Sequence, residues 1–277
     1  MLSWGVGDFL IQKSARKFGS WMALFYITCF GAIVLFPFVY SDLGSVFIQH
    51  KGLLVLAIAS LVITFSGILD FQALKVGKIS VVEPIYALEL PITAGFAAFI
   101  IGERLSFLQT FFIIAIMVGI FLVATKSFKQ YKKLKWEKGV WLAILATVAM
   151  GVVNFLFGVA SRETSPLMVS WFSRTFMALV TLVYLIKFSS AHEIIKGWKV
   201  NKRLILAVGF IDSLAWVAFS YAMLYIPIAI ATGISESYIA IAAALGIFIN
   251  KEKLKKHQWV GLAVCLMAAV ILALITK

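Results

Sequence analysis

Long apolar runs alternate with short polar breaks along the whole chain. A helix of about 20 residues crosses the roughly 30 Å hydrocarbon core of a bilayer, and most of the runs reach that length. Lipid offers no partner to a free backbone amide or carbonyl, and no run alternates as a barrel strand does, so the runs must be helices. The pattern predicts ten spans, at residues 1–13, 20–40, 52–74, 79–101, 105–125, 139–161, 166–187, 203–225, 227–249 and 256–275.

The composition agrees with this pattern. Of the 277 residues, 62% are hydrophobic and only 13% are charged. A soluble domain of this length needs a more polar surface, so we expect an all-α integral membrane protein without a large soluble domain. The first run is short for a span, and it lacks the basic start and the cleavage-like end of a signal peptide.

The net charge of +13 comes from Lys and Arg residues that lie mostly in the breaks between the runs. Of the 25 Lys and Arg residues, 20 lie in the loops after the odd-numbered spans, four lie in the other loops and the C-terminus, and Arg174 lies inside a span. This bias is typical of cytoplasmic loops in membrane proteins rather than of nucleic-acid binding. It predicts that the odd-numbered loops are cytoplasmic and that both termini face outward.

The cysteine and histidine residues do not form the pattern of a metal site or a catalytic site. Cys29 and Cys265 lie inside apolar runs, and His50, His192 and His257 lie in predicted loops. These spacings form neither a zinc site nor a nucleophilic triad, so we predict no metal, no cofactor and no enzymatic activity.

The chain repeats itself. The stretch "GVGDFLIQKSARKFGS" from Gly5 resembles "GVVNFLFGVASRETSP" from Gly151, and "ERLSFLQ" from Glu103 resembles "EKLKKHQ" from Glu252. Five predicted spans in each copy invert the second copy relative to the first, as in many transporters. We therefore predict a first repeat at 1–126 with a shortened first helix, a basic cytoplasmic connector at 127–138 and a second repeat at 139–277. The matched pairs include Asp8 with Asn154 and Arg16 with Arg162.

The first copy resembles the EamA-type repeat of the drug/metabolite transporter superfamily. The resemblance rests on a small-Leu pair, a short polar turn, a helix with a central proline, a Gly-Glu-Arg triplet and a following Gln. These are Ala73-Leu74, Gly77-Lys78, Pro91, Gly102-Glu103-Arg104 and Gln109; the looser second copy keeps Ala222-Met223, Pro227, Glu252, Leu254, Gln258 and Gly261. The resemblance implies two inverted five-helix repeats, transport of a small metabolite or drug, a leaning toward export, and a multi-pass protein of a prokaryotic-type cell membrane.

Charged residues inside the predicted spans are the candidate site. An Asp or Arg at a helix centre costs about 2.5–3.5 kcal/mol, so such groups should face a wet cavity or pair with one another. Depth along the spans places Arg174, Glu89 and Glu236 in one mid-membrane layer, with Asp212 within reach of the arginine. A structural ion pair of Arg174 with Glu236 or Asp212 is the alternative to a binding role. The charged residues within or at the edge of the spans are Asp8, Asp70, Glu83, Glu89, Asp212, Glu236 and Arg174. The candidate binding residues among them are Glu83, Glu89, Arg174, Asp212 and Glu236.

Aromatic residues accompany these charges. Trp171, Trp216 and Tyr86 each lie three or four residues from Arg174, Asp212 and Glu89 respectively, which places each on the helix face of its charge; Tyr238 flanks Glu236. Aromatic rings beside charges suit an organic ion, and ordinary core packing is the alternative.

The fourth predicted span carries two prolines, Pro84 and Pro91, and two glutamates. Each proline removes a backbone donor, so we expect kinks at both, and the freed carbonyls then need water or neighbouring helices. Glu89 lies near mid-membrane, whereas Glu83 lies near the cytoplasmic end and could instead reach the interface. The second copy has Ala240 where Pro91 stands, which predicts no proline kink there.

The leading hypothesis is a secondary transporter, and a probable exporter, that works by alternating access. No phosphate-binding signature occurs in the sequence, so a gradient would supply the energy, and the excess of acidic residues favours a cationic or zwitterionic solute or proton exchange. The expected partners are a small solute and the lipid bilayer, without nucleic acid; the oligomeric state stays open. The alternative is a membrane-embedded sensor or receptor, which would carry a signalling domain.

Overall fold

The computed structural model describes the chain except for residues 1, 49, 77–84, 126–137, 242–253 and 277. The side chains of Asp8, Phe9 and Lys138 are also outside the described part. The described residues are helical almost throughout and contain no strand. The elements are α1 (Leu2–Phe18), α2 (Ser20–Val39), η1 (Tyr40–Asp42), α3 (Leu43–Ile48), α4 (His50–Val76), α6 (Glu89–Ile101), α7 (Phe107–Ala124), α8 (Lys138–Glu163), α9 (Pro166–Phe188), α10 (Ala191–Tyr225), α11 (Ile228–Glu236) and α13 (Lys256–Ile275).

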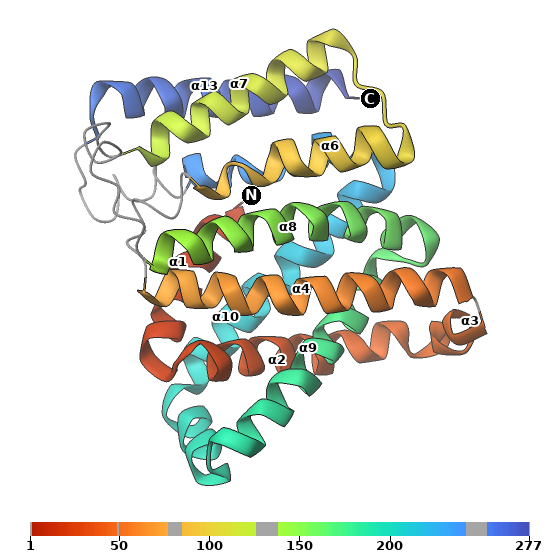
Figure 1. Ribbon diagram of the computed structural model, residues 1–277, viewed down its shortest axis with the longest axis vertical. Helices are drawn as coiled ribbons and strands as arrows, with labels where there is room; N and C mark the ends of the chain where they lie inside the picture. Colours follow the sequence, from red (N-terminus) through yellow and green to blue (C-terminus); the bar gives the residue numbers. More distant parts are fainter. Residues whose placement is uncertain (1, 49, 77–84, 126–137, 242–253, 277) are drawn as a thin grey trace.

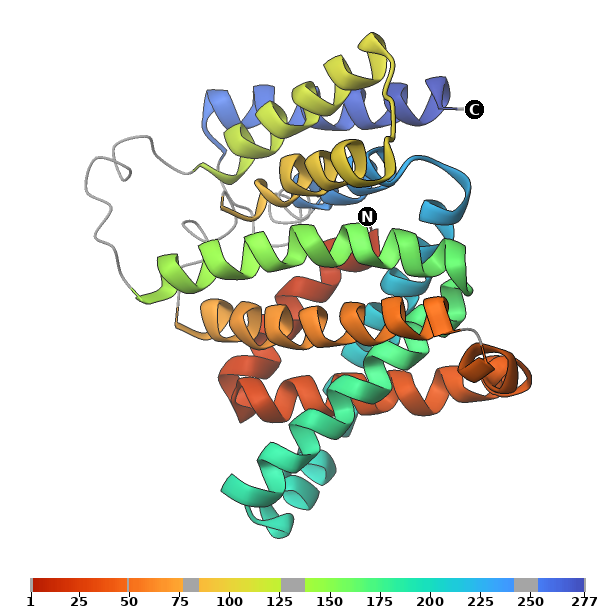
Figure 2. The same cartoon turned by 45° about the vertical axis from the view of Figure 1, so that its right-hand side comes forward.

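Most of the helices run side by side and form one bundle (Figure 1). The most extensive contacts pair α4 with α8, α7 with α13, and α2 with α9. Each pair joins a helix from before residue 126 to one from after residue 137, so the two parts of the chain interleave. The turned view keeps α7 and α13 together at one edge of the bundle, and the corner between α9 and α10 extends from the opposite edge (Figure 2).

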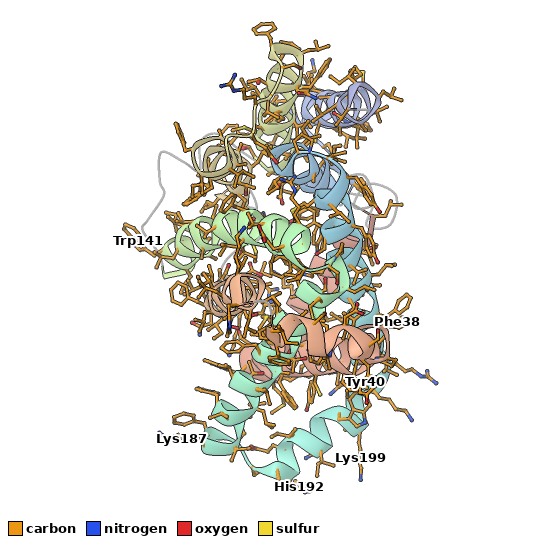
Figure 3. The ribbon with its side chains drawn as sticks, turned by 90° about the vertical axis from the view of Figure 1, so that its right-hand side faces the viewer. Phe38, Tyr40, Trp141, Lys187, His192 and Lys199 are labelled. Atoms are coloured by element: carbon orange, nitrogen blue, oxygen red, sulfur yellow. The ribbon has the colours of Figure 1, made fainter. Side chains whose placement is uncertain are left out.

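Within the described part of the chain, seven helices are long and apolar enough to cross a membrane. Outward-facing side chains are apolar too, since Phe99 of α6 and Phe107 of α7 are 92% and 89% exposed. Trp141 points away from one flank of the bundle, and Phe38 and Tyr40 lie at the other (Figure 3). Such a surface suits lipid, and the chain is a multi-pass membrane protein. The seven candidates are Ser20–Ile48, His50–Val76, Phe107–Ala124, Gly139–Glu163, Pro166–Phe188, Ala191–Tyr225 and Lys256–Ile275; α1, α6 and α11 are shorter.

Two predicted loops are largely helical. α1 continues past Lys13 to Phe18, and the chain turns at Gly19, whose φ of 87° favours glycine. α10 begins at Ala191, and a kink at Asn201, at φ −122° and ψ 15°, separates its first ten residues from the part that covers the predicted span at 203–225. Charge alone therefore did not mark the helix ends, because Lys, Arg and Ala all favour helix.

The fourth and ninth predicted spans are interrupted. Residues 85–86 are helical, residues 87–88 form a turn, and α6 starts at Glu89. Pro91 lies in the first turn of α6, and the turn at residues 87–88 comes three and four residues before it, where the ring and the missing N–H of a proline interrupt a helix. Pro84, the other predicted kink, lies outside the described residues together with Glu83.

The second interruption falls at Ser237. α11 ends at Glu236, Ser237 forms a turn, and helix resumes at residues 238–241. The expectation of an unbroken second copy, based on Ala240, was wrong, because a helix can also break where there is no proline. Leu88 and Ser237 are 149 residues apart, the same offset that relates Glu103 to Glu252. Each break therefore falls at the same position of the sequence repeat.

Candidate functional site

A cavity of about 120 Å³ lies inside the bundle. Its walls come from α1, α2, α4, α6, α8, α9, α10 and α11, together with the residues beside the two helix breaks. Eight of the acidic, basic and aromatic residues singled out in the sequence line it: Asp70, Tyr86, Glu89, Arg174, Asp212, Trp216, Glu236 and Tyr238.

Arg174 on α9 pairs with Asp212 on α10. Its Nη2 donates to the Asp212 carboxylate at 2.8 Å and to the Asp212 carbonyl oxygen at 3.1 Å, and the two residues are 5% and 7% exposed. Of the two pairings considered from depth, the structure thus forms the one with Asp212. Such a buried pair offsets the cost of desolvating both charges and leaves Arg174 and Asp212 with no net charge between them.

Three further carboxylates face the same cavity. Asp70 lies on α4 and lines the cavity together with Tyr86. Glu89 and Glu236 are 9% and 6% exposed, and each adjoins a helix break. Glu89 lies at the amino end of α6, where the helix dipole stabilises a negative charge. Glu236 lies at the carboxyl end of α11, where the dipole disfavours one.

The Glu89 helix is held against α8 by a hydroxyl bridge. Thr93 Oγ1 donates to the carbonyl oxygens of Gly151 at 3.0 Å and of Glu89 at 2.9 Å. Gly151 leaves room for this approach, because a Cβ there would overlap Ile92. Close packing therefore fixes the position of Glu89 relative to α8.

Aromatic rings cover one side of the cavity. Trp4 lies edge-on to Trp216 with ring centroids 5.5 Å apart and 6.4 Å from Tyr238, and Phe157 lies 4.8 Å from Trp216. Trp171 does not line the cavity: its Nε1 donates to the Ala32 carbonyl oxygen at 3.1 Å, and its ring lies beside Phe36.

The described residues hold no group of three or more His, Cys, Asp or Glu side chains that could bind a metal ion.

The comparison with family models decides the class. The model described as the EamA-like transporter family matches residues 1–125 and 137–274, which together make up nearly the whole chain. The chain belongs to the EamA-like transporter family. It is thus a membrane transporter of the drug/metabolite type.

Other comparisons add the fold of this EamA transporter but no substrate. No curated protein matches the chain. Among solved structures, one described only as the crystal structure of a protein has a TM-score of 0.70 and 17% sequence identity, and the match covers 99% of this chain and 96% of that one. At this identity the likeness speaks for the fold alone.

Several cavity residues of this EamA transporter were not selected from its sequence. Asp70 counts among the acids inside spans but was not assigned to the site, and Trp4 lies in the short first helix. Asn154 was visible as the partner of Asp8 in the repeat, which was the one available signal. Thr28, Ser170 and Ser173 also line the cavity, and small hydroxyl residues in apolar helices carry no pattern that distinguishes a wall from ordinary packing.

Proposed function

We propose that this EamA transporter moves a small organic cation by alternating access, as an exporter of the cell membrane that exchanges the solute for protons. The observation that carries the proposal is the charge of the cavity. Four carboxylates and one arginine line it among the described residues, and the arginine is paired with Asp212. Asp70, Glu89 and Glu236 add three further carboxylates to the lining, beside aromatic faces that suit an organic cation.

Alternating access is supported by the two helix breaks. In many transporters, interrupted helices at matching positions of inverted repeats surround the substrate near the membrane midplane. Here the breaks at Leu88 and Ser237 adjoin Glu89 and Glu236, one in each predicted repeat. We infer that these carboxylates come from equivalent helices of two inverted halves.

The contacts between helices support the repeat boundaries at 1–126 and 139–277. The predicted counterparts are α1 and α8, α2 and α9, and α4 and α10. If each helix is replaced by its counterpart, the contact of α4 with α8 becomes that of α10 with α1, and the contact of α4 with α9 becomes that of α10 with α2. All four contacts occur in the structure. On this view α1, α6 and α11 complete ten spans with the seven long helices.

The test uses three probes of one shape and different charge: benzylamine, benzoate and benzyl alcohol. Thermal unfolding of the purified protein in detergent should shift upward with benzylamine alone, because a ligand that binds the folded state stabilises it. In proteoliposomes, an imposed pH gradient should drive benzylamine uptake or release faster than in protein-free liposomes of the same lipid, which measure passage of the neutral amine through the bilayer. A shift with benzoate, or with all three probes equally, would overturn the cation assignment. Binding without movement across the membrane would favour a sensor over a transporter.

A further inference from the structure

Glu103 follows the last turn of α6. Gly102 ends that helix with a φ of 68°, a left-handed conformation that suits glycine, and the Glu103 N–H donates to the Ala97 carbonyl oxygen at 3.0 Å. The Gly-Glu pair thus turns the chain and directs it toward α7. The Glu103 side chain is 13% exposed, which is unusual for a carboxylate in a connection between helices.

This carboxylate caps a helix of the other half of the chain. Its Oε1 accepts from the Ile228 amide at 2.9 Å and its Oε2 faces the Ala229 amide at 3.4 Å. α11 follows Pro227, which supplies no side-chain cap. Glu103 therefore satisfies the free amides at the start of α11 and adds a negative charge where the helix dipole favours one.

Arg162, near the end of α8, completes the cluster. Its Nη2 donates to Glu103 at 3.0 Å and to the Ile226 carbonyl oxygen at 3.1 Å, and its Nε donates to the Met223 carbonyl oxygen at 3.0 Å. The last two groups belong to the carboxyl end of α10 and its cap. One ion pair thus joins the α6–α7 connection to the ends of α8, α10 and α11.

The same three helices line the cavity farther along. Phe157 of α8 and Trp216 of α10 lie in the wall, and Glu236 ends α11 there. Arg162 is five residues beyond Phe157, about 7.5 Å along a helix. Packing is tight in between, since a Cβ at Gly158 would overlap Ile228. The cluster therefore lies beyond one end of the cavity, where the walls converge.

We propose that Glu103 and Arg162 form a lock that holds this end of the cavity closed and positions α11, and that the lock must open for solute to pass at this end. The inference rests on the proposed alternating access. The predicted orientation makes this the outward end. Glu103 acts through α11 on Glu236, so it is a positioning residue rather than a ligand.

The experiment measures access to the cavity and requires no known substrate. Cys29 and Cys265 are replaced by Ser and Ala, and Ser170→Cys places one small thiol in the cavity wall. A membrane-impermeant cationic methanethiosulfonate is added to right-side-out and to inside-out vesicles. With Glu103→Gln the labelling rate should rise about tenfold or more from one side only, because a hydrogen bond to a charged group contributes enough for such a shift.

Two variants separate the lock from general loosening. Glu163→Gln removes the neighbouring carboxylate, which pairs with the exposed Lys51, and should leave labelling unchanged. Arg162→Lys keeps the charge but loses the fork that reaches both carbonyl oxygens, so it should give a smaller rise than Glu103→Gln. Folding is checked by thermal unfolding of each variant.

Equal labelling of the Glu103→Gln and Glu163→Gln proteins, with both folded, would overturn the lock. A rise from both sides of the membrane would do so as well, because it indicates loosening of the bundle. Neither outcome depends on whether benzylamine is carried. Failure of the proposed solute class and failure of the lock are therefore separate results.

Discussion

The side chain of Arg174 lies directly against the backbone of Gly31. A Cβ added at Gly31 would overlap Arg174 Cδ and come within 3.0 Å of its Nε and 2.9 Å of Ser213 Oγ. α2 thus leaves, at a single glycine, the space through which the arginine stem reaches Asp212. The ion pair of the cavity depends on this third helix as well as on the two that carry it.

Gly31→Ala should therefore displace Arg174 and lower stability by about 1–3 kcal/mol, as overpacking of a full interior does. Gly95→Ala is the matched control, because Gly95 also lies in an apolar helix but has no atom within 4 Å of an added Cβ. Thermal unfolding in detergent measures both. If Gly31→Ala unfolds at the wild-type temperature, the arginine is not held by this contact.

Arg174→Ala should lower the stability of the protein by more than Gly31→Ala does. It leaves Asp212 buried without its cation, and breaking a buried pair in this way costs ~3–5 kcal/mol. The double variant Arg174→Met with Asp212→Asn removes both charges and should recover much of the lost stability. Thermal unfolding in detergent compares the stability of the single and the double variant. A double variant no more stable than Arg174→Ala would show that the pair is not the main source of the effect.

The same two variants separate structure from binding. If Arg174 serves only the pair, the double variant should also recover benzylamine transport. If it folds well but stays inactive, Arg174 contributes to the solute site itself. Transport in proteoliposomes, compared at equal protein content, distinguishes the two roles.

The orientation predicted from the Lys and Arg residues can be tested at two exposed positions. Ser41→Cys, in η1, should react with an impermeant thiol reagent added to intact cells, and His192→Cys, at the start of α10, should not. Both variants are made without Cys29 and Cys265. The opposite labelling pattern would invert the topology and would make the Glu103–Arg162 lock a cytoplasmic one.

Much of the fold could be predicted from apolar runs, because a span must be apolar over a fixed length. α2, α7, α9 and α13 begin and end within two residues of the predicted spans. The helix breaks could not be predicted in this way. Neither Leu88 nor Ser237 is itself a Gly or Pro: the first break lies within one turn before Pro91, whereas no proline follows the second.

The depth of the site residues along their helices could be predicted, but the direction in which each side chain points could not. Counting residues from the helix ends placed Asp212 within reach of Arg174, and the structure pairs the two. The same counting cannot tell which neighbour a side chain meets. Trp171 is three residues from Arg174, which is about 60° around the helix, and this was enough to turn it toward α2 and away from the cavity.

The last prediction concerns Glu89 and Glu236, which adjoin the two helix breaks. Glu89→Gln and Glu236→Gln keep the shape and most of the hydrogen bonding of each side chain but remove its titration. If one of them carries the coupling proton, its replacement should abolish benzylamine accumulation driven by a pH gradient. Exchange of labelled for unlabelled benzylamine should survive, because the loaded cavity can still change its access.

Glu163→Gln, an acid-to-amide change outside the cavity, is the control and should behave as wild type. If both glutamates only attract the cation, driven accumulation and exchange should weaken together, since both then depend on affinity. If they serve stability alone, the unfolding temperature should fall while transport per folded molecule stays constant. Accumulation that follows the pH gradient as wild type does in both single variants would remove proton coupling from these two residues and leave Asp70 as the cavity carboxylate to test next, because Asp212 is held by Arg174.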